Sequence, residues 1–182
     1  MFLIPQDYES IIRNEIRDAI ADDRLYNILA SELAARAEME GYLRKRFDVA
    51  KIFIDVLEWK ETEQYTAGQS VYYTDPELGE QLVYKCLQDC KGVAPGAEAV
   101  EWELKDERHP SIKMYLLDIT VYHLYTASPV IPQLRVNRYD AAIAWLKMVL
   151  KDEITPDLPL LAEPPQNTTI LLGSRQKLRH IW

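Results

Sequence analysis

The chain has 182 residues, of which 48% are hydrophobic, so it fits one globular domain with room for a small insertion and is excluded from the disordered class. No apolar run approaches the roughly 20 residues needed to cross a bilayer, and the first residues lack the pattern of a signal peptide. We therefore expect synthesis and use in the cytoplasm without a membrane partner. The formal net charge of -8 argues against general nucleic-acid binding by the body of the chain, because phosphate contacts need clustered Lys and Arg.

Two amphipathic helices are predicted at the start of the chain. Pro5 suits the first position of a helix, and apolar residues at steps of three and four form one stripe over residues 4–20. Asp22 or Asp23 can cap a second helix. The apolar positions of this second helix extend over residues 25–47, where several alanines raise the helix propensity.

The middle of the chain is predicted to form a small β-module. Aromatic and β-branched residues alternate there, and glycines separate the runs. Residues 65–90 are typical of a β-hairpin that turns at residues 75–79. We expect a β-module at residues 59–105, inserted between helical parts at residues 1–58 and 106–158.

Two further helices are predicted after this module. Helical periodicity resumes after Pro110, and the pair Ser128-Pro129 ends that helix. Asn137 is the predicted cap of the last helix, whose apolar positions match the helical template at every step up to Leu150. The predicted fold class is therefore α+β, mainly α: a helical bundle with an inserted small β-hairpin or sheet module and an extended C-terminal arm.

Residues 159–182 form the predicted arm. They have no helical period, and Pro164 with Pro165 favours an extended path. Residues 168–172 are suited to adding a strand to a partner. There is no Asp or Glu from Pro164 onward, whereas the end of the arm is basic. An acidic body with a basic tail indicates that the tail contacts something acidic, such as another copy of the same protein.

No catalytic machinery is recognisable in the sequence. The glycine patterns of phosphate-binding loops and of serine hydrolases are absent, and His109, His123 and His180 lie far apart. We predict no catalytic residue, no cofactor and no enzymatic activity. Cys86 and Cys90 lack a nearby second pair of Cys or His ligands, so we predict reduced, partly buried thiols and no metal site.

Two motifs in the helical parts carry a resemblance to a known family. The chain begins MFLIPQDYES, and the second helix ends in a Tyr-Leu-x-x-Arg-aromatic motif. The last helix opens with Arg-Tyr-x-x-Ala-x-x-Trp-Leu. Together these regions resemble the Mu-type phage family of small head–tail connector (neck) proteins over roughly residues 1–58 and 106–155. The matching residues are Tyr42, Leu43, Arg46 and Phe47 in the first motif and Arg138, Tyr139, Ala142, Trp145 and Leu146 in the second.

This resemblance implies a structural virion protein rather than an enzyme. The expected assembly is a homo-oligomeric ring, commonly of twelve copies, that lies below the portal in the virion neck and is assembled in the bacterial host cytoplasm. The expected partners are the portal protein and further neck or tail proteins, and DNA would pass through the ring lumen without specific binding. We expect the arm to dock on a neighbour or on the portal through Arg175, Lys177, Arg179 and Trp182.

The β-module has a resemblance of its own. Its order of aromatic, glycine and proline residues is similar to small carbohydrate-binding modules of the chitin-binding type, with Trp59, Tyr65, Gly68, Val71, Tyr84, Gly92, Pro95 and Trp102 in matching positions. Candidate residues for glycan or protein contact are Trp59, Tyr72, Tyr73 and Trp102. Besides the connector function, two alternatives stay open: a glycan-binding protein that uses the β-module, and a cytosolic enzyme or regulator whose site is unrecognised. Within a connector, the β-module would serve as a protein contact or spacer.

Overall fold

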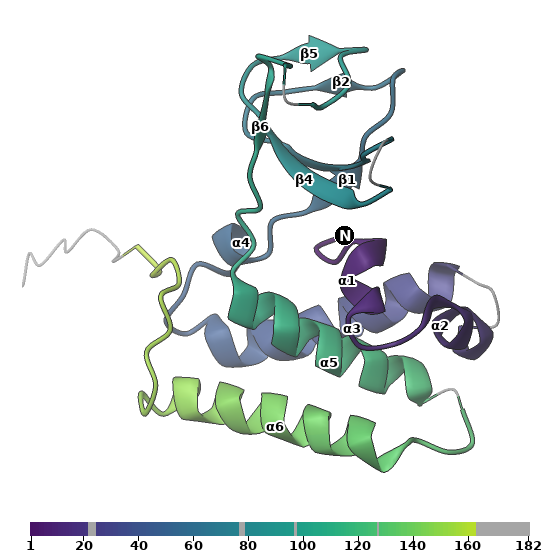
Figure 1. The fold of residues 1–182 in the computed structure, drawn as a ribbon. Helices are drawn as coiled ribbons and strands as arrows, with labels where there is room; N and C mark the ends of the chain where they lie inside the picture. Colours follow the sequence, from purple (N-terminus) through teal and green to yellow (C-terminus); the bar gives the residue numbers. More distant parts are fainter. Residues whose placement is uncertain (22–24, 77–78, 97, 127, 163–182) are drawn as a thin grey trace, which may run out of the picture.

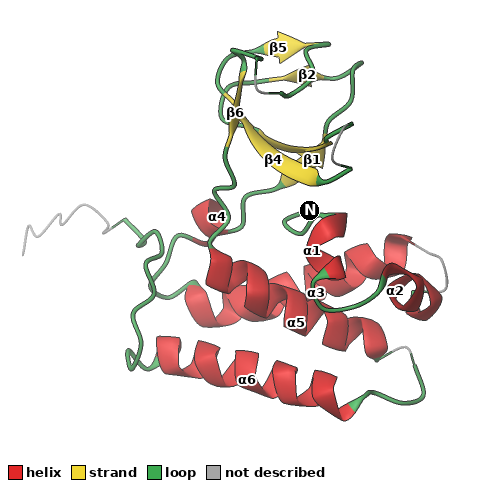
Figure 2. Ribbon diagram, in the orientation of Figure 1, coloured by secondary structure: helices red, strands yellow, loops and turns green. Residues whose placement is uncertain are grey.

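The structure is a computed structural model that describes residues 1–21, 25–76, 79–96, 98–126 and 128–162. These residues form helices and a mixed sheet, which confirms the predicted α+β class. The strands gather on one side of the molecule and the long helices on the other, with the N-terminus between them (Figures 1 and 2).

Among the described residues, the helical part has three long helices that pack on one another and three short ones. Its core is a continuous cluster of buried apolar side chains, among them Leu43, Leu116, Ile119 and Leu146. The helices are α1 (Pro5–Glu9), α2 (Asn14–Ile20), α3 (Leu25–Leu43), α4 (Val49–Ile52), α5 (Pro110–Tyr125) and α6 (Gln133–Leu150). α5 packs against both α3 and α6 and lies between them in the ribbon view (Figure 1).

Two details of the predicted helices are corrected. The stripe over residues 4–20 is divided between α1, which ends at Glu9, and α2, which starts anew after Arg13, because Arg13 adopts an extended conformation at the N-cap of α2. α6 begins four residues before the predicted cap Asn137, because Pro132 occupies the N-cap position with an extended ψ of 136°. The Asn137 side chain accepts a hydrogen bond from Nε2 of Gln133 instead. The predicted caps Asp22 and Asp23 lie outside the described residues.

The β-unit, which we define as Val56 to Lys105, contains two sheets. A four-stranded sheet has the order β1-β3-β4-β6, and β2 pairs with β5 in a two-stranded sheet. β3 and β4 form the predicted hairpin, with Val71 opposite Tyr84. β1 runs parallel to β3, and it begins three residues before the boundary expected from the sequence. The strands are β1 (Val56–Glu58), β2 (Gln64–Tyr65), β3 (Ser70–Thr74), β4 (Gln81–Cys86), β5 (Cys90–Lys91) and β6 (Trp102–Leu104).

The N-terminal segment joins the sheet to the helices. Ile4 packs with Val56 and Val83 on one face of the sheet. The amide of Val56 donates a hydrogen bond to the carbonyl of Met1 at 2.7 Å. On the helical side, a buried carboxylate of Glu32 accepts hydrogen bonds from the amides of residues 2 and 3. Burial raises the pKa of Glu32, although these two amides act in the opposite direction.

Arg108 is the polar centre of this junction. It is 4% exposed, and its Nη1 donates to the carbonyl of Phe2 at 2.8 Å and to Oδ2 of Asp7 at 2.6 Å. Nε and Nη2 donate to the two carboxylate oxygens of Asp106, each at 2.8 Å. Burial would raise the pKa of Asp106, but the hydrogen bonds and charge of Arg108 outweigh it and the pKa lies below its usual range. Arg108 therefore ties α1, the N-terminal segment and the start of α5 together.

Replacement of Arg108 by Ala should lower the free energy of unfolding by about 3 kcal/mol or more, because it leaves two carboxylates and a carbonyl without their shared donor. Arg108→Lys should cost less, since an ammonium keeps the charge but loses the two-pronged contact. Urea unfolding monitored by circular dichroism measures both. The control is Arg44→Ala, an exposed position at the end of α3, which should change the free energy by less than about 0.5 kcal/mol. Equal effects of Arg108→Ala and Arg44→Ala on the free energy of unfolding would contradict the role of Arg108 in holding these segments together.

Candidate functional site

The docking residues predicted from the sequence lie beyond the last described residue. Arg175, Lys177, Arg179 and Trp182 are all within residues 163–182, which the structure does not describe. What the structure does show is the point from which this segment starts. After α6 the chain runs back past the end of α3 and past α4, and its last described residues lie on the surface there (Figure 1).

A short antiparallel contact fixes this starting point. Phe47 forms an isolated β-bridge with Leu160. The amide of Leu161 donates to the carbonyl of Arg46, and the amide of Asp48 donates to the carbonyl of Pro159, both at 2.9 Å. The Phe47 ring is buried, whereas the Leu160 and Leu161 side chains are exposed. Residues 159–161 are therefore held in place beside the end of α3.

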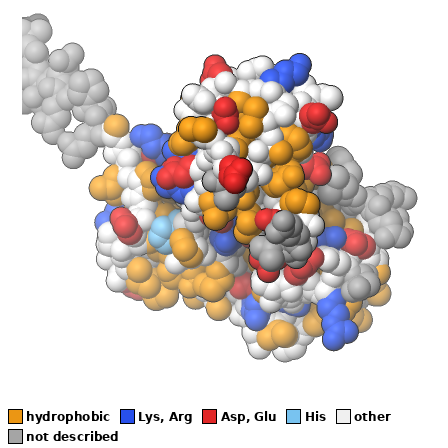
Figure 3. Space-filling view, turned by 45° about the horizontal axis from the view of Figure 1, so that its top comes forward, with side chains coloured by type: hydrophobic (Ala, Val, Ile, Leu, Met, Phe, Trp, Pro, Cys, Tyr) orange, Lys and Arg blue, Asp and Glu red, His pale blue; other side chains and the backbone are white. Residues whose placement is uncertain are grey.

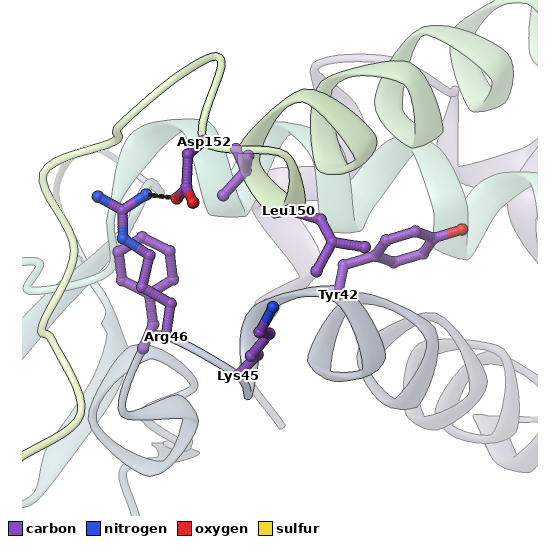
Figure 4. A pocket seen from close by; sticks show the side chains of 7 residues that line it. Tyr42, Lys45, Arg46, Leu150 and Asp152 are labelled. Carbon is purple, nitrogen blue, oxygen red and sulfur yellow. Dashed lines mark hydrogen bonds and ion pairs between the residues drawn. The ribbon is translucent and has the colours of Figure 1, made fainter.

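A groove of about 430 Å³ lies next to this exit, between the end of α3 and the end of α6. Figure 4 shows Arg46 turned toward Asp152, with Lys45 and Tyr42 along α3 and Leu150 on the facing helix. Arg46 pairs with Asp152, and its guanidinium lies 5.3 Å from the centroid of the Phe47 ring. In the described part of the chain Lys45 has no ion-pair partner. The groove thus offers one neutralised and one free cation beside an apolar wall.

The backbone at Asp152 explains how this ion pair forms. Asp152 has a φ of 61°, in the left-handed region that Asp tolerates better than most residues. The amide of Glu153 donates to the carbonyl of Met148 at 2.9 Å, which closes the end of α6. This turn directs the Asp152 carboxylate back over the end of α3, where Arg46 lies.

The two sequence motifs singled out above have different places in the helical core. In the first motif Tyr42, Arg46 and Phe47 line the groove, and Leu43 is fully buried beside them. The residues of the second motif instead join the helices. The Tyr139 hydroxyl donates to Glu38 on α3 at 2.7 Å, Arg138 pairs with Asp118 on α5 at 3.2 Å, and Trp145 stacks on Tyr115 with centroids 4.5 Å apart.

The two tryptophans predicted as contact residues are held by one carbonyl. The indole N–H groups of Trp59 and Trp102 both donate to the carbonyl of Val93, at 3.1 and 3.0 Å. Trp102 is 5% exposed and lies in the core of the β-unit, where its ring meets Tyr65 at 5.4 Å between centroids. Its ring therefore belongs to the interior, whereas Trp59 is half-buried at the edge of that core.

Tyr72 and Tyr73 point to opposite faces of β3, and both are half-buried. Tyr73 meets Trp59 edge-on, with centroids 5.4 Å apart. Tyr72 packs on the apolar cluster that joins the sheet to the N-terminal segment. Both tyrosines and Trp59 border a depression of about 160 Å³ together with Glu58 and Thr74. Three of the four predicted contact residues thus border this depression, whereas Trp102 is buried in the core of the β-unit and does not line it.

The two cysteines are buried free thiols in the core of the β-unit. Sγ of Cys86 donates to the carbonyl of Gln88 at 3.0 Å. Burial, with a further contribution from neighbouring Cys86, raises the pKa of the Cys90 thiol to about 11. Among the described residues there is no cluster of three or more His, Cys, Asp or Glu side chains arranged to hold a metal ion.

Comparison of the chain with models of protein families, with curated proteins and with solved structures found no match. In the described ranges, no helix combines the length and apolar character that spanning a membrane requires.

Sequence reasoning missed the role of Arg108 and Asp152. Their partners are far away in the chain, and no local pattern marks them. A partial signal for Asp152 was its place just after a long amphipathic helix, where left-handed residues are common.

The buried thiols should resist modification in the folded protein. At pH 8 a thiol whose pKa is about 11 carries little thiolate, and thiolate is the reacting form. We expect iodoacetamide to label both Cys86 and Cys90 at least about a hundredfold more slowly in the native protein than in urea, because burial shields both sulfur atoms and Cys90 is also kept protonated. Intact-protein mass spectrometry over time measures both rates. Labelling at similar rates in both conditions would contradict the buried position of the thiols.

Proposed function

We propose that this protein is a structural subunit of the head–tail connector in the neck of a tailed phage, assembled in the bacterial host. The observation that carries the proposal is the place of the two motifs in one helical core. One lines the groove next to residues 159–161, and the other fastens α6 to α3 and α5. A connector subunit needs such a rigid helical body with a segment fixed at its exit, because ring assembly depends on reproducible geometry between copies.

In this proposal the fold is a helical bundle interrupted by an inserted β-module, with an arm at residues 159–182. The β-unit lies between α4 and α5 in the chain, and helices on both sides of it contribute to a single core. An insertion of this kind leaves the bundle contacts intact and extends one surface of the ring. The small β-unit has its own apolar cluster and leans on the N-terminal segment.

The proposed partners are a portal protein, further neck or tail proteins and other copies of this chain, in a ring of twelve. The net charge of -8 suits a ring through which DNA passes without being held. No catalytic step is part of this function. The arm residues Arg175, Lys177, Arg179 and Trp182 would make the contact with a neighbour or the portal.

The test is co-expression with the portal protein of the same phage, followed by affinity capture and electron microscopy. The full chain should be captured as a ring on the portal. A chain ending at Leu161 keeps the contact between residues 46–48 and 159–161, so it should unfold at the same urea concentration but bind the portal at least about tenfold more weakly. Undiminished binding of the shortened chain would contradict the role of the arm. Absence of any portal complex with the full chain would contradict the connector function itself.

A second candidate function is glycan binding at the depression beside Trp59. The observation in its favour is the half-buried pair of Trp59 and Tyr73, next to the carboxylate of Glu58. If this site binds chitin fragments, tryptophan emission should change saturably up to millimolar chitotriose, and Tyr73→Ala should abolish the change. Maltotriose at equal concentration is the control. An unchanged spectrum in the wild-type protein would eliminate this candidate.

A further inference from the structure

β6 is an edge strand with one open side. The sheet order places it next to β4 alone. Trp102, Glu103 and Leu104 face Cys86, Lys85 and Tyr84 respectively. An edge strand presents unpaired backbone groups, which are a template for another strand.

The hydrogen bonds around β6 show which backbone groups are directed outward. The amide of Leu87 donates to the carbonyl of Glu101 at 2.8 Å, and the amide of Lys105 donates to the carbonyl of Val83 at 3.0 Å. In an antiparallel pair of strands, residues whose backbone groups bond to the partner strand alternate with residues whose backbone groups do not. The backbone N–H and C=O of Glu103 are therefore directed toward β4, and those of Leu104 are not. The N–H and C=O of Leu104 therefore point away from β4, and no partner for either is present in the described residues.

The side chains along this edge alternate in character. Glu101 and Glu103 lie on one face of the strand, and Trp102 and Leu104 lie on the other. Leu104 is 63% exposed, because no further strand covers it. Two cations lie on the face of the glutamates: Lys85 is opposite Glu103 in the register, and Lys105 follows it in the strand. Both lysines form their ion pairs with Glu107, at 2.9 and 3.0 Å. Glu107, and to a smaller extent Glu103, raises the pKa of Lys105. In the part of the chain that the structure describes, Glu101 and Glu103 have no ion-pair partner.

The β-unit as a whole is also negatively charged. Between Val56 and Lys105 the sequence has ten acidic residues against four basic ones, so most of the chain's net charge of -8 resides there. Figure 3 shows acidic side chains spread over the visible face of the molecule around the β-unit, with hydrophobic side chains between them. A strand that is basic on one face and apolar on the other would complement this edge, because its side chains would pair with the glutamates on one face and with Leu104 on the other.

The C-terminal segment contains such a pattern. In the stretch Arg-Gln-Lys-Leu-Arg, the basic residues Arg175, Lys177 and Arg179 occupy alternate positions, with Leu178 between the last two. In a strand, alternate residues share a face. A pairing that places the three cations beside Glu101 and Glu103 necessarily places Leu178 on the face of Leu104.

We propose that residues 175–179 of a second copy of this chain add to the open edge of β6 as a fifth strand. The inference rests on the proposed connector function, because a ring needs a head-to-tail contact between unlike surfaces. It assigns these two surfaces to the arm and the β6 edge. The β-unit then acts as the receptor for the neighbour's arm.

Two charge-reversed variants of the full chain test the contact. Glu101→Lys with Glu103→Lys alters the edge, and Arg175→Glu with Lys177→Glu and Arg179→Glu alters the arm. Each should weaken self-association, measured by sedimentation at low salt, by about tenfold or more, since several charge pairs are lost together. Combining all five substitutions in one chain should restore association. The matched control, Glu61→Lys with Glu80→Lys, makes the same charge change at exposed positions of the β-unit outside β6 and should leave association unchanged.

A mixture of the two variants shows whether β6 binds the arm of a second copy or the arm of its own chain. The edge variant retains a basic arm and the arm variant retains an acidic edge, so their mixture should form heterodimers at concentrations where neither variant associates detectably by itself. Absence of heterodimers would overturn the proposal, as would a wild-type chain that stays monomeric at every concentration.

Amide hydrogen exchange in the same mixture tests strand addition. The Leu104 amide of the arm variant should be protected upon mixing, because it acquires an acceptor. Heterodimers without this protection would overturn the added strand and leave only a charge contact. A portal-bound ring that forms normally with both variants would overturn this inference while leaving the connector function intact.

Discussion

The fold depends on one buried cation. Arg108 lies where the chain returns from the β-unit to the helices, and it binds the Phe2 carbonyl, Asp7 and Asp106 at once. A guanidinium in so apolar a place is stable only when its donors are satisfied, so each partner holds the others in position. The consequence is that the N-terminal segment, α1, the sheet and α5 take up one arrangement. The sheet is too small to fix its own orientation, and this junction does so for it.

That arrangement sets the two surfaces on which the proposed function relies. On the helical side, the end of α3 meets the turn after α6, where Arg46 and Asp152 pair, and the last described residues leave from beside them. On the sheet side, β6 pairs with β4 along one side, and its other side is open, with the exposed side chains of Glu103 and Leu104 on opposite faces. A chain with a fixed exit and a separate receptive edge has two unlike surfaces, which is what a closed ring of identical subunits requires.

The aromatic residues of the β-unit follow the sequence pattern of a sugar-binding module, but some of them form its interior. Their order along the chain resembles a sugar-binding module, yet the indole groups of Trp59 and Trp102 converge on the carbonyl of Val93. In so small a unit the largest side chains are needed to form an interior, and this use competes with display at the surface. Trp102 has become part of the core, whereas Trp59 and Tyr73 retain a partly open side.

The sequence by itself determined the α+β class, the long helices, the β3–β4 hairpin and its turn, because periodicity and turn residues act over short distances. It also located the motif that ends at Phe47, although not its contact with Leu160. Only the tertiary structure decided that β1 joins the sheet beside β3, that Trp102 is interior, that Arg108 is the junction, and that β6 is left as an open edge. Each of these depends on residues far apart in the chain, and long-range pairing leaves no local pattern to read.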